Sequence, residues 1–248
     1  MSIWYSPPKK PLIEGHRATS AIAPENTITS FRQSIADGAD GVELDVRPTS
    51  DGEVIVIHDG TLSRTTNGRG SVEKKSLAEL KQLDAGRWFG KIFEGEQIPT
   101  LKETLHLLKG KIAIDIELKS GSHSKDIVDR TCKVVRELDM VEEVLLTSFD
   151  SRFLLRAKQI EKRIPLGFLY KPSRHIKSGV AIARKLGARY LILHSRNIRE
   201  NIIAEARDSD ILIGEYPVDT KQRFERSMKN EIDVLFSNHP AYLRTLQR

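Results

Sequence analysis

Residues 41–59 read Gly41-Val-Glu43-Leu-Asp45-Val-Arg47-Pro-Thr-Ser-Asp51-Gly52-Glu53-Val-Ile-Val-Ile-His58-Asp59. The apolar, β-branched residues on either side of Asp51-Gly52 predict two strands joined by a tight turn, because both turn residues tolerate positive φ. With a two-residue loop, His58 lies opposite Asp45. Glu43 and Asp45 share one face of their strand, since side chains alternate along it. The stretch therefore predicts a hairpin that gathers two carboxylates and an imidazole.

Short apolar runs recur along the chain and alternate with segments of helical spacing. The candidate strands are residues 12–16, 41–46, 111–117, 144–148, 165–169, 190–194, 211–215 and 234–237, with 53–58 as a separate hairpin arm. Eight strand–helix units in about 250 residues predict a (β/α)8 TIM barrel. A doubly wound open sheet is disfavoured, because no Gly-x-Gly-x-x-Gly loop follows the first strand. We expect a single domain over residues 1–248, with residues 59–99 as a small insertion after strand two, over the barrel mouth.

The composition narrows the function classes. The chain has 248 residues, 39% hydrophobic and 30% charged, with a formal net charge of +6. Lys and Arg are interspersed with Asp and Glu and aromatics make up only 6%, so we expect no nucleic-acid partner. No apolar run reaches the roughly 20 residues of a membrane helix. The N-terminus lacks the apolar core of a secretory signal and the single cysteine, Cys132, has no internal partner, so we expect a cytoplasmic protein.

In a barrel the functional side chains gather at the carboxyl ends of the strands. Strand three alternates so that its polar residues 115, 117 and 119 point the same way. Together with the hairpin, that rule selects these candidates: His16, Arg17, Glu43, Asp45, His58, Glu117 and Lys119. Three further residues at later strand ends, His194, Glu215 and His239, are isolated and therefore weaker candidates.

Glu43, Asp45 and Glu117 lie on neighbouring strands of the predicted barrel. Two carboxylates about 4 Å apart repel by roughly 4 kcal/mol at an effective dielectric constant near 20, so three together need a cation or protonation. An all-oxygen ligand set favours Mg²⁺ or Ca²⁺ over Zn²⁺. The three residues therefore predict a site for a divalent cation.

His16 and His58 flank that site, and a pKa near neutrality suits histidine to act as general base and general acid. Arg17 and Lys119 suit the binding of phosphate oxygens. The alternative interpretation is that the carboxylates form structural ion pairs with Arg17, Arg47 or Lys119. That alternative is the weaker one, because acidic side chains that face the inside of a barrel are costly to bury.

Taken together, these residues resemble the glycerophosphodiester phosphodiesterase family. The matching motifs are Gly15-His16-Arg17, Ala23–Thr27, Gly38–Val46, Asp51–Asp59, Thr61–Gly70, Leu77–Lys81, Leu83–Gly86, Ile98–Leu101 and Ile116–Lys119. The dense match covers residues 12–120. The resemblance implies a barrel with an insertion after strand two, a divalent cation on the three acidic residues, and the two histidines as the acid–base pair. It also implies hydrolysis of a small-molecule glycerophosphodiester to sn-glycerol 3-phosphate and an alcohol.

The chain departs from the family's usual motifs at three places. Ala18 stands where Gly commonly follows His-Arg, residues 215–218 replace the usual Trp-Thr-x-Asn, and Ser237-Asn238-His239-Pro240 replaces the usual Thr-Asp-x-Pro. The predicted metal and histidine positions are unaffected, whereas the walls that select the substrate differ.

Two other functions remain open. A lysophospholipase D-type or phospholipase-type barrel acting on lysophospholipids needs an apolar surface near the mouth, which Trp88-Phe89 could supply. A non-catalytic protein that binds phosphorylated ligands would keep Arg17 and Lys119 but would need no acid–base pair. The retention of His16 and His58 argues against it. The sequence leaves the alcohol head group and the oligomeric state open.

Overall fold

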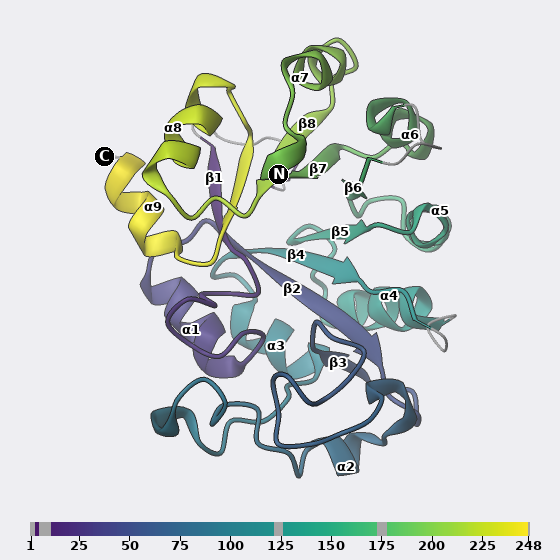
Figure 1. The fold of residues 1–248 in the computed structure, drawn as a ribbon. Helices are drawn as coiled ribbons and strands as arrows, with labels where there is room; N and C mark the ends of the chain where they lie inside the picture. Colours follow the sequence, from purple (N-terminus) through teal and green to yellow (C-terminus); the bar gives the residue numbers. More distant parts are fainter. Residues whose placement is uncertain (1–2, 5–10, 122–125, 173–177, 248) are drawn as a thin grey trace.

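A closed parallel sheet forms the centre of the protein. The computed structural model describes residues 3–4, 11–121, 126–172 and 178–247 (Figure 1). The parallel strands in these residues are β1 (Leu12–Gly15), β2 (Gly41–Pro48), β4 (Ala113–Leu118), β5 (Val144–Ser148), β6 (Leu166–Tyr170), β7 (Tyr190–His194), β8 (Leu212–Tyr216) and β9 (Val234–Ser237). Their order is β1-β9-β8-β7-β6-β5-β4-β2, and β1 also pairs with β2. The predicted (β/α)8 barrel is confirmed, and an open sheet is excluded because the first and last strands of that order are paired.

Helices follow the strands and surround the sheet (Figure 1). They are α1 (Ile28–Ala36), α3 (Leu101–Leu108), α4 (Ile127–Glu137), α5 (Ser151–Ile160), α6 (Gly179–Leu186), α7 (Glu200–Arg207), α8 (Lys221–Lys229) and α9 (Pro240–Gln247). Local sequence explains their ends. The Thr27 side chain accepts a hydrogen bond from the Ser30 N–H in a capping box at the start of α1. Gly187 ends α6 with φ 66°, the left-handed conformation that glycine adopts without strain. Among the described residues, no helix is long and apolar enough to cross a membrane.

Alternation along the strands separates two apolar layers. On β2, Val42, Leu44 and Val46 are fully buried in the large cluster between the sheet and the helices. Trp4, which precedes the first strand, packs with a second cluster at inward-facing strand positions: Leu12, Ala113, Leu145, Leu169, Tyr190, Ile192, Val234 and Phe236. The residues of the candidate site lie beyond this cluster, toward the carboxyl ends of the strands, and Glu14 of β1 is a further, fully buried carboxylate inside the barrel.

The hairpin arm exists, but its register differs from the prediction. β3 (Val54–Val56) pairs antiparallel with β2, and the N–H of Ile57 donates to the carbonyl of Asp45 at 2.9 Å. Ile57, not His58, therefore lies opposite Asp45, and the predicted pairing was wrong by one residue. His58 lies one residue beyond that pair and still reaches the cavity that Glu43 lines.

The cause is the length of the loop. The N–H of Thr49 donates to the carbonyl of Glu53 at 2.9 Å, which leaves three residues, Ser50-Asp51-Gly52, in the loop. Gly52 has φ 88°. A three-residue loop that ends in a left-handed residue is the next most common hairpin connection after the two-residue turns.

Residues 59–99 contain η1 (Val72–Lys74), α2 (Leu77–Leu80) and η2 (Lys91–Phe93), and they share a small apolar cluster with Ile55 and Ile57 of the hairpin arm. Figure 1 shows this segment beside α1, α3 and β3. Polar contacts attach it to the barrel, among them Lys81 Nζ with Glu103 at 2.6 Å and Arg64 with Glu25 at 2.7 Å.

Candidate active site

The predicted site residues converge on one cavity at the carboxyl ends of the strands. It has a volume of about 170 Å³. The lining residues are His16, Arg17, Glu43, His58, Asp115, Glu117, Lys119, Thr147, Phe149, Leu169, Ile192, Tyr216 and Phe236. Asp45 does not line the cavity; it is fully buried beside the lining residues, and its strand position is adjacent to that of Glu117. All seven predicted site residues thus lie together.

Three carboxylates form the most acidic part of the site. Glu43, Asp45 and Glu117 each offer an oxygen atom, and these atoms lie within 4.8 Å of one another. Burial, followed by repulsion from Asp45, raises the pKa of Glu43 well above its usual range. Burial also raises the pKa of Glu117 to about 7, against the opposing effect of Lys119. The two raised pKa values indicate that the charged forms of Glu43 and Glu117 are unfavourable in this buried group of acids.

Cationic side chains compensate only part of that charge. Lys119 Nζ lies 2.8 Å from Glu117 Oε1 and 3.0 Å from Asp45 Oδ1, and Arg17 Nε lies 3.7 Å from Asp45 Oδ2. Burial alone would raise the pKa of Asp45, but Lys119, with help from His58 and Arg17, holds it well below its usual range. In the described part of the chain, no side-chain nitrogen of Lys or Arg lies within 4.0 Å of a Glu43 carboxylate oxygen. Its Oε2 accepts the Arg17 backbone N–H at 2.8 Å.

The structural ion pairs considered as an alternative therefore form only in part. Arg17 and Lys119 pair with the carboxylates, but Arg47 donates to the carbonyl of His58 at 2.9 Å and pairs with Glu73 at 3.9 Å. An incompletely neutralised, all-oxygen cluster of this size fits a hard divalent cation.

Each candidate histidine is oriented through its Nδ1 atom, but by a different chemical group. Nδ1 of His16 lies 2.8 Å from the amide oxygen of Asn238, and Nδ1 of His58 lies 2.7 Å from the carboxylate of Asp59. Burial and the neighbouring Arg17 lower the pKa of His16 to about 4. Burial also lowers the pKa of His58, while Asp45 acts in the opposite direction. His16 is consequently neutral at pH 7.

The loop after β1 holds two of the acidic residues in place, Glu43 and Asp45. Arg17, Ala18 and Asn26 have φ values of 53°, 65° and 58°. This left-handed backbone brings the Asn26 amide to Asp45 Oδ2 at 2.8 Å. Asn26 lies within the Ala23–Thr27 motif of the family resemblance, but the motif alone did not predict that Asn26 contacts Asp45.

Two other supporting residues lie in the same part of the site. Arg64 bridges Asp59 and Glu25 with contacts of 2.7 Å to each, and it thereby ties the insertion to the residue that orients His58. Tyr216 lines the cavity, and burial raises its pKa to about 12. The inward position of Tyr216 follows from alternation along β8, whereas the predicted candidate at the end of that strand was Glu215.

Two of the weaker candidates lie elsewhere. Glu215 is fully buried on the outer side of β8, where Arg226 contacts it at 2.6 Å and the Ser227 hydroxyl donates to it at 2.8 Å. The His239 ring packs against Tyr242 instead of lining the cavity. His194 lies closer to the site, with its ring centroid 5.4 Å from that of Tyr216, and its Nδ1 accepts a hydrogen bond from the Arg196 N–H.

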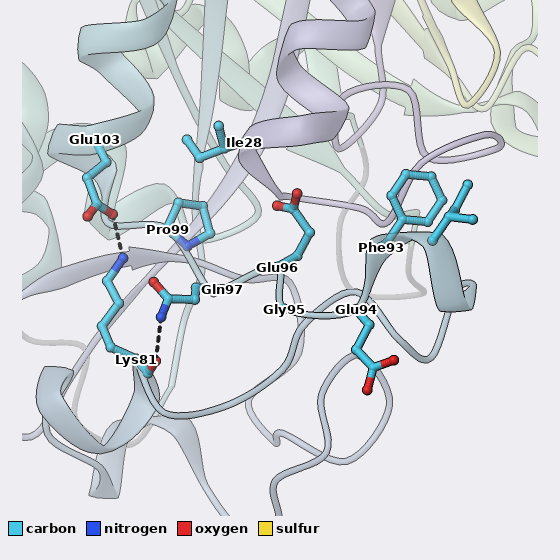
Figure 2. Close-up of a pocket in the computed structure, with 10 residues that line it drawn as sticks. Ile28, Lys81, Phe93, Glu94, Gly95, Glu96, Gln97, Pro99 and Glu103 are labelled. Carbon is cyan, nitrogen blue, oxygen red and sulfur yellow. Dashed lines mark hydrogen bonds and ion pairs between the residues drawn. The ribbon is translucent and has the colours of Figure 1, made fainter.

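A second, larger hollow lies away from this chemistry. Its volume is about 550 Å³, and it is formed where residues 92–97 of the insertion face α1 and α3 (Figure 2). The side chains shown there are mainly acidic or apolar, and Lys81 is engaged by Glu103. None of the candidate catalytic or metal-binding residues lines it, so the smaller cavity is the candidate active site.

Comparison with known proteins agrees with this geometry. Residues 16–242 match the model of the glycerophosphoryl diester phosphodiesterase family. A glycerophosphodiester phosphodiesterase from Caldanaerobacter subterraneus subsp. tengcongensis is 36% identical over 241 residues, which is 96% of this chain and 98% of that protein.

Solved structures of phosphodiesterases are also similar to this chain. A phosphodiesterase from Oleispira antarctica, in complex with the product sn-glycerol-3-phosphate, has a TM-score of 0.90 at 28% identity and covers 98% of both chains. A glycerophosphodiester phosphodiesterase from Agrobacterium tumefaciens has a TM-score of 0.83 at 29% identity, covering 95% of this chain and 99% of that one. The chain therefore belongs to the glycerophosphoryl diester phosphodiesterase family and is a phosphodiesterase.

Proposed function

We propose that this enzyme uses a divalent cation and the pair His16 and His58 to hydrolyse glycerophosphodiesters to sn-glycerol 3-phosphate and an alcohol. The observation that carries the proposal is the meeting, at one cavity, of three carboxylates, two cationic side chains and two separately oriented histidines. The sn-glycerol-3-phosphate bound by the similar Oleispira enzyme supports the substrate class.

Glu43, Asp45 and Glu117 are the residues that would hold the cation, and their oxygen atoms favour Mg²⁺ or Ca²⁺. When bound, such a cation neutralises phosphoryl oxygens and lowers the pKa of a hydroxyl group or water. Arg17 and Lys119 line the same cavity and bind the remaining phosphate charge, the first as a planar fork and the second as a point charge.

The two histidines have partners suited to different roles. His16 is paired with a neutral amide and is uncharged at pH 7, so it accepts the proton of the attacking hydroxyl or water. His58 is paired with the Asp59 carboxylate, which favours the protonated ring against the burial that lowers its pKa, and this pairing suits it to donate a proton to the leaving alkoxide. We therefore assign His16 as general base and His58 as general acid.

The test is substitution of each histidine. We expect His16→Ala and His58→Ala each to lower kcat by at least about 100-fold, the low end for general acid–base catalysis, with the fold retained. His106→Ala, on the exposed face of α3, is the matched control. Near-normal turnover in both site variants, measured as glycerol 3-phosphate release, would contradict the acid–base assignment.

The structure gives the alternative functions less support. The Trp88 side chain is 41% exposed and packs against Phe89, but neither residue lines the site cavity, so an adjoining surface for lysophospholipids is not evident among the described residues. A non-catalytic ligand-binding protein does not require two histidines that are each fixed through Nδ1. We further propose that residues 1–248 act as one catalytic domain in the cytoplasm, with the insertion joined to the site through Arg64.

A further inference from the structure

A chain of hydrogen bonds leads away from His16 to a residue outside the cavity. Nδ1 of His16 lies 2.8 Å from Oδ1 of Asn238, which follows β9. Nδ2 of Asn238 donates to Oδ2 of Asp219 at 2.7 Å, and Asp219 lies in the loop between β8 and α8. Asp219 contacts no atom of the proposed cation site and does not line the cavity.

Asp219 determines which way the Asn238 amide faces. Its oxygens receive the Asn238 backbone N–H at 2.8 Å, the Asn238 Nδ2 at 2.7 Å and the Ser237 hydroxyl at 3.1 Å. A carboxylate only accepts hydrogen bonds, so the NH₂ group of Asn238 has to face Asp219. The amide oxygen then has to face His16, and the Ser20 hydroxyl donates to the same oxygen at 2.7 Å.

The amide in turn determines the tautomer of the imidazole. Because Oδ1 of Asn238 is an acceptor, Nδ1 of His16 must carry a proton, which leaves the lone pair on Nε2 in the neutral ring. If the amide were reversed, an NH₂ group would face Nδ1 and favour the opposite tautomer. Position 238 is also one of the places where the chain departs from the family's usual motif, which has Asp there.

We propose that Asp219 is a positioning residue that acts through Asn238 to hold His16 in the Nδ1–H tautomer, with Nε2 available as the base. The proposal rests on the proposed role of His16 as general base. It differs from a purely structural role for Asp219, in which the same hydrogen bonds only attach the β8–α8 loop to the end of β9. A structural role predicts a loss of stability without a change of tautomer.

The first test is Asp219→Asn, which removes the obligatory acceptor and lets the Asn238 amide take either orientation. The wrong tautomer of a catalytic histidine can lower kcat by about 10⁴-fold; because Asp219 acts through an intervening amide, we expect a loss of at least about 10-fold in kcat. The ¹⁵N chemical shifts of the His16 ring should show a gain of the Nε2–H form. The exposed Asp208→Asn, at the end of α7, is the matched control for loss of one carboxylate.

The second test is the double variant Asp219→Asn/Asn238→Asp. The carboxylate then stands at position 238, where it accepts from Nδ1–H of His16, and the amide at position 219 supplies both the donor and the acceptor that the loop requires. We expect the Nδ1–H tautomer and most of the lost turnover to return. Thermal unfolding of each variant establishes that it is folded.

The outcomes separate this proposal from the proposed function. Unchanged tautomer and unchanged kcat in Asp219→Asn would overturn the positioning role, and so would a loss of activity with unchanged tautomer that the double variant fails to restore. A changed tautomer with full activity would support the hydrogen-bond chain but contradict the role of His16 as base. A changed tautomer with lost activity that the double variant restores supports both.

Discussion

Glu117→Gln, studied in the absence of divalent cations, tests whether keeping the Glu117 carboxylate charged in the buried cluster lowers the stability of the fold. Burial raises the pKa of Glu117 from its ordinary value of 4.5 to about 7. The folded protein therefore binds more protons than the unfolded chain between these pH values, so stability falls as pH rises through that window. At 1.36 kcal/mol per pKa unit, the rise amounts to about 3 kcal/mol above pH 7. The variant lacks the titrating group and escapes this loss.

The assay is urea unfolding of both proteins in EDTA at several pH values from 4 to 8. Comparing the two proteins cancels the titration of groups that they share. We expect the difference in free energy of unfolding to move by about 3 kcal/mol in favour of the variant as pH rises from 4.5 to 7. The exposed Glu142→Gln is the matched control. A difference that stays constant over the whole range would refute the reasoning.

Two further predictions concern the cation and the fold. At one hundred times its Kd, Mg²⁺ or Ca²⁺ should raise the free energy of unfolding by about 2.7 kcal/mol, and Asp45→Asn should abolish the effect. For a chain of this size that is a rise in Tm of roughly 5–10 °C by calorimetry, and an equal rise in the variant would count against the site. Arg226→Met should destabilise the protein by about 2–4 kcal/mol, because it leaves the buried carboxylate of Glu215 without its cation. Lys229→Met on the same helix is the control, and equal denaturation midpoints for the two variants would show that the Glu215 pair adds nothing.

The barrel could be predicted because each strand corresponds to a short apolar run in the sequence, whose alternate residues face inward and outward. On β2, alternation alone places Glu43 and Asp45 inside and Leu44 outside, as the structure has them. The hairpin register could not be fixed in the same way. Asp51-Gly52 fits both a two-residue and a three-residue loop, and only the pairing of Thr49 with Glu53 decides between them.

The site was predictable where residues lie on strands and less so where they lie on loops. Glu215 was a weaker candidate for the mouth, but alternation along β8 turns it outward and places its neighbour Tyr216 inward. The partner of His16, Asn238, is 222 residues away in the sequence. No local pattern predicts a hydrogen bond across that separation, since it depends on how the closed barrel brings β1 and β9 together.

The most direct measurement is release of sn-glycerol 3-phosphate from glycerophosphocholine by the purified protein, with and without EDTA. We predict release in the presence of Mg²⁺ or Ca²⁺, loss of release in EDTA, and recovery when the cation is restored. His16→Ala should release product at least about 100-fold more slowly than the unaltered protein when the cation is present. Release that continues unchanged in EDTA would contradict the cation at Glu43, Asp45 and Glu117, and no release under any condition would contradict the proposed substrate.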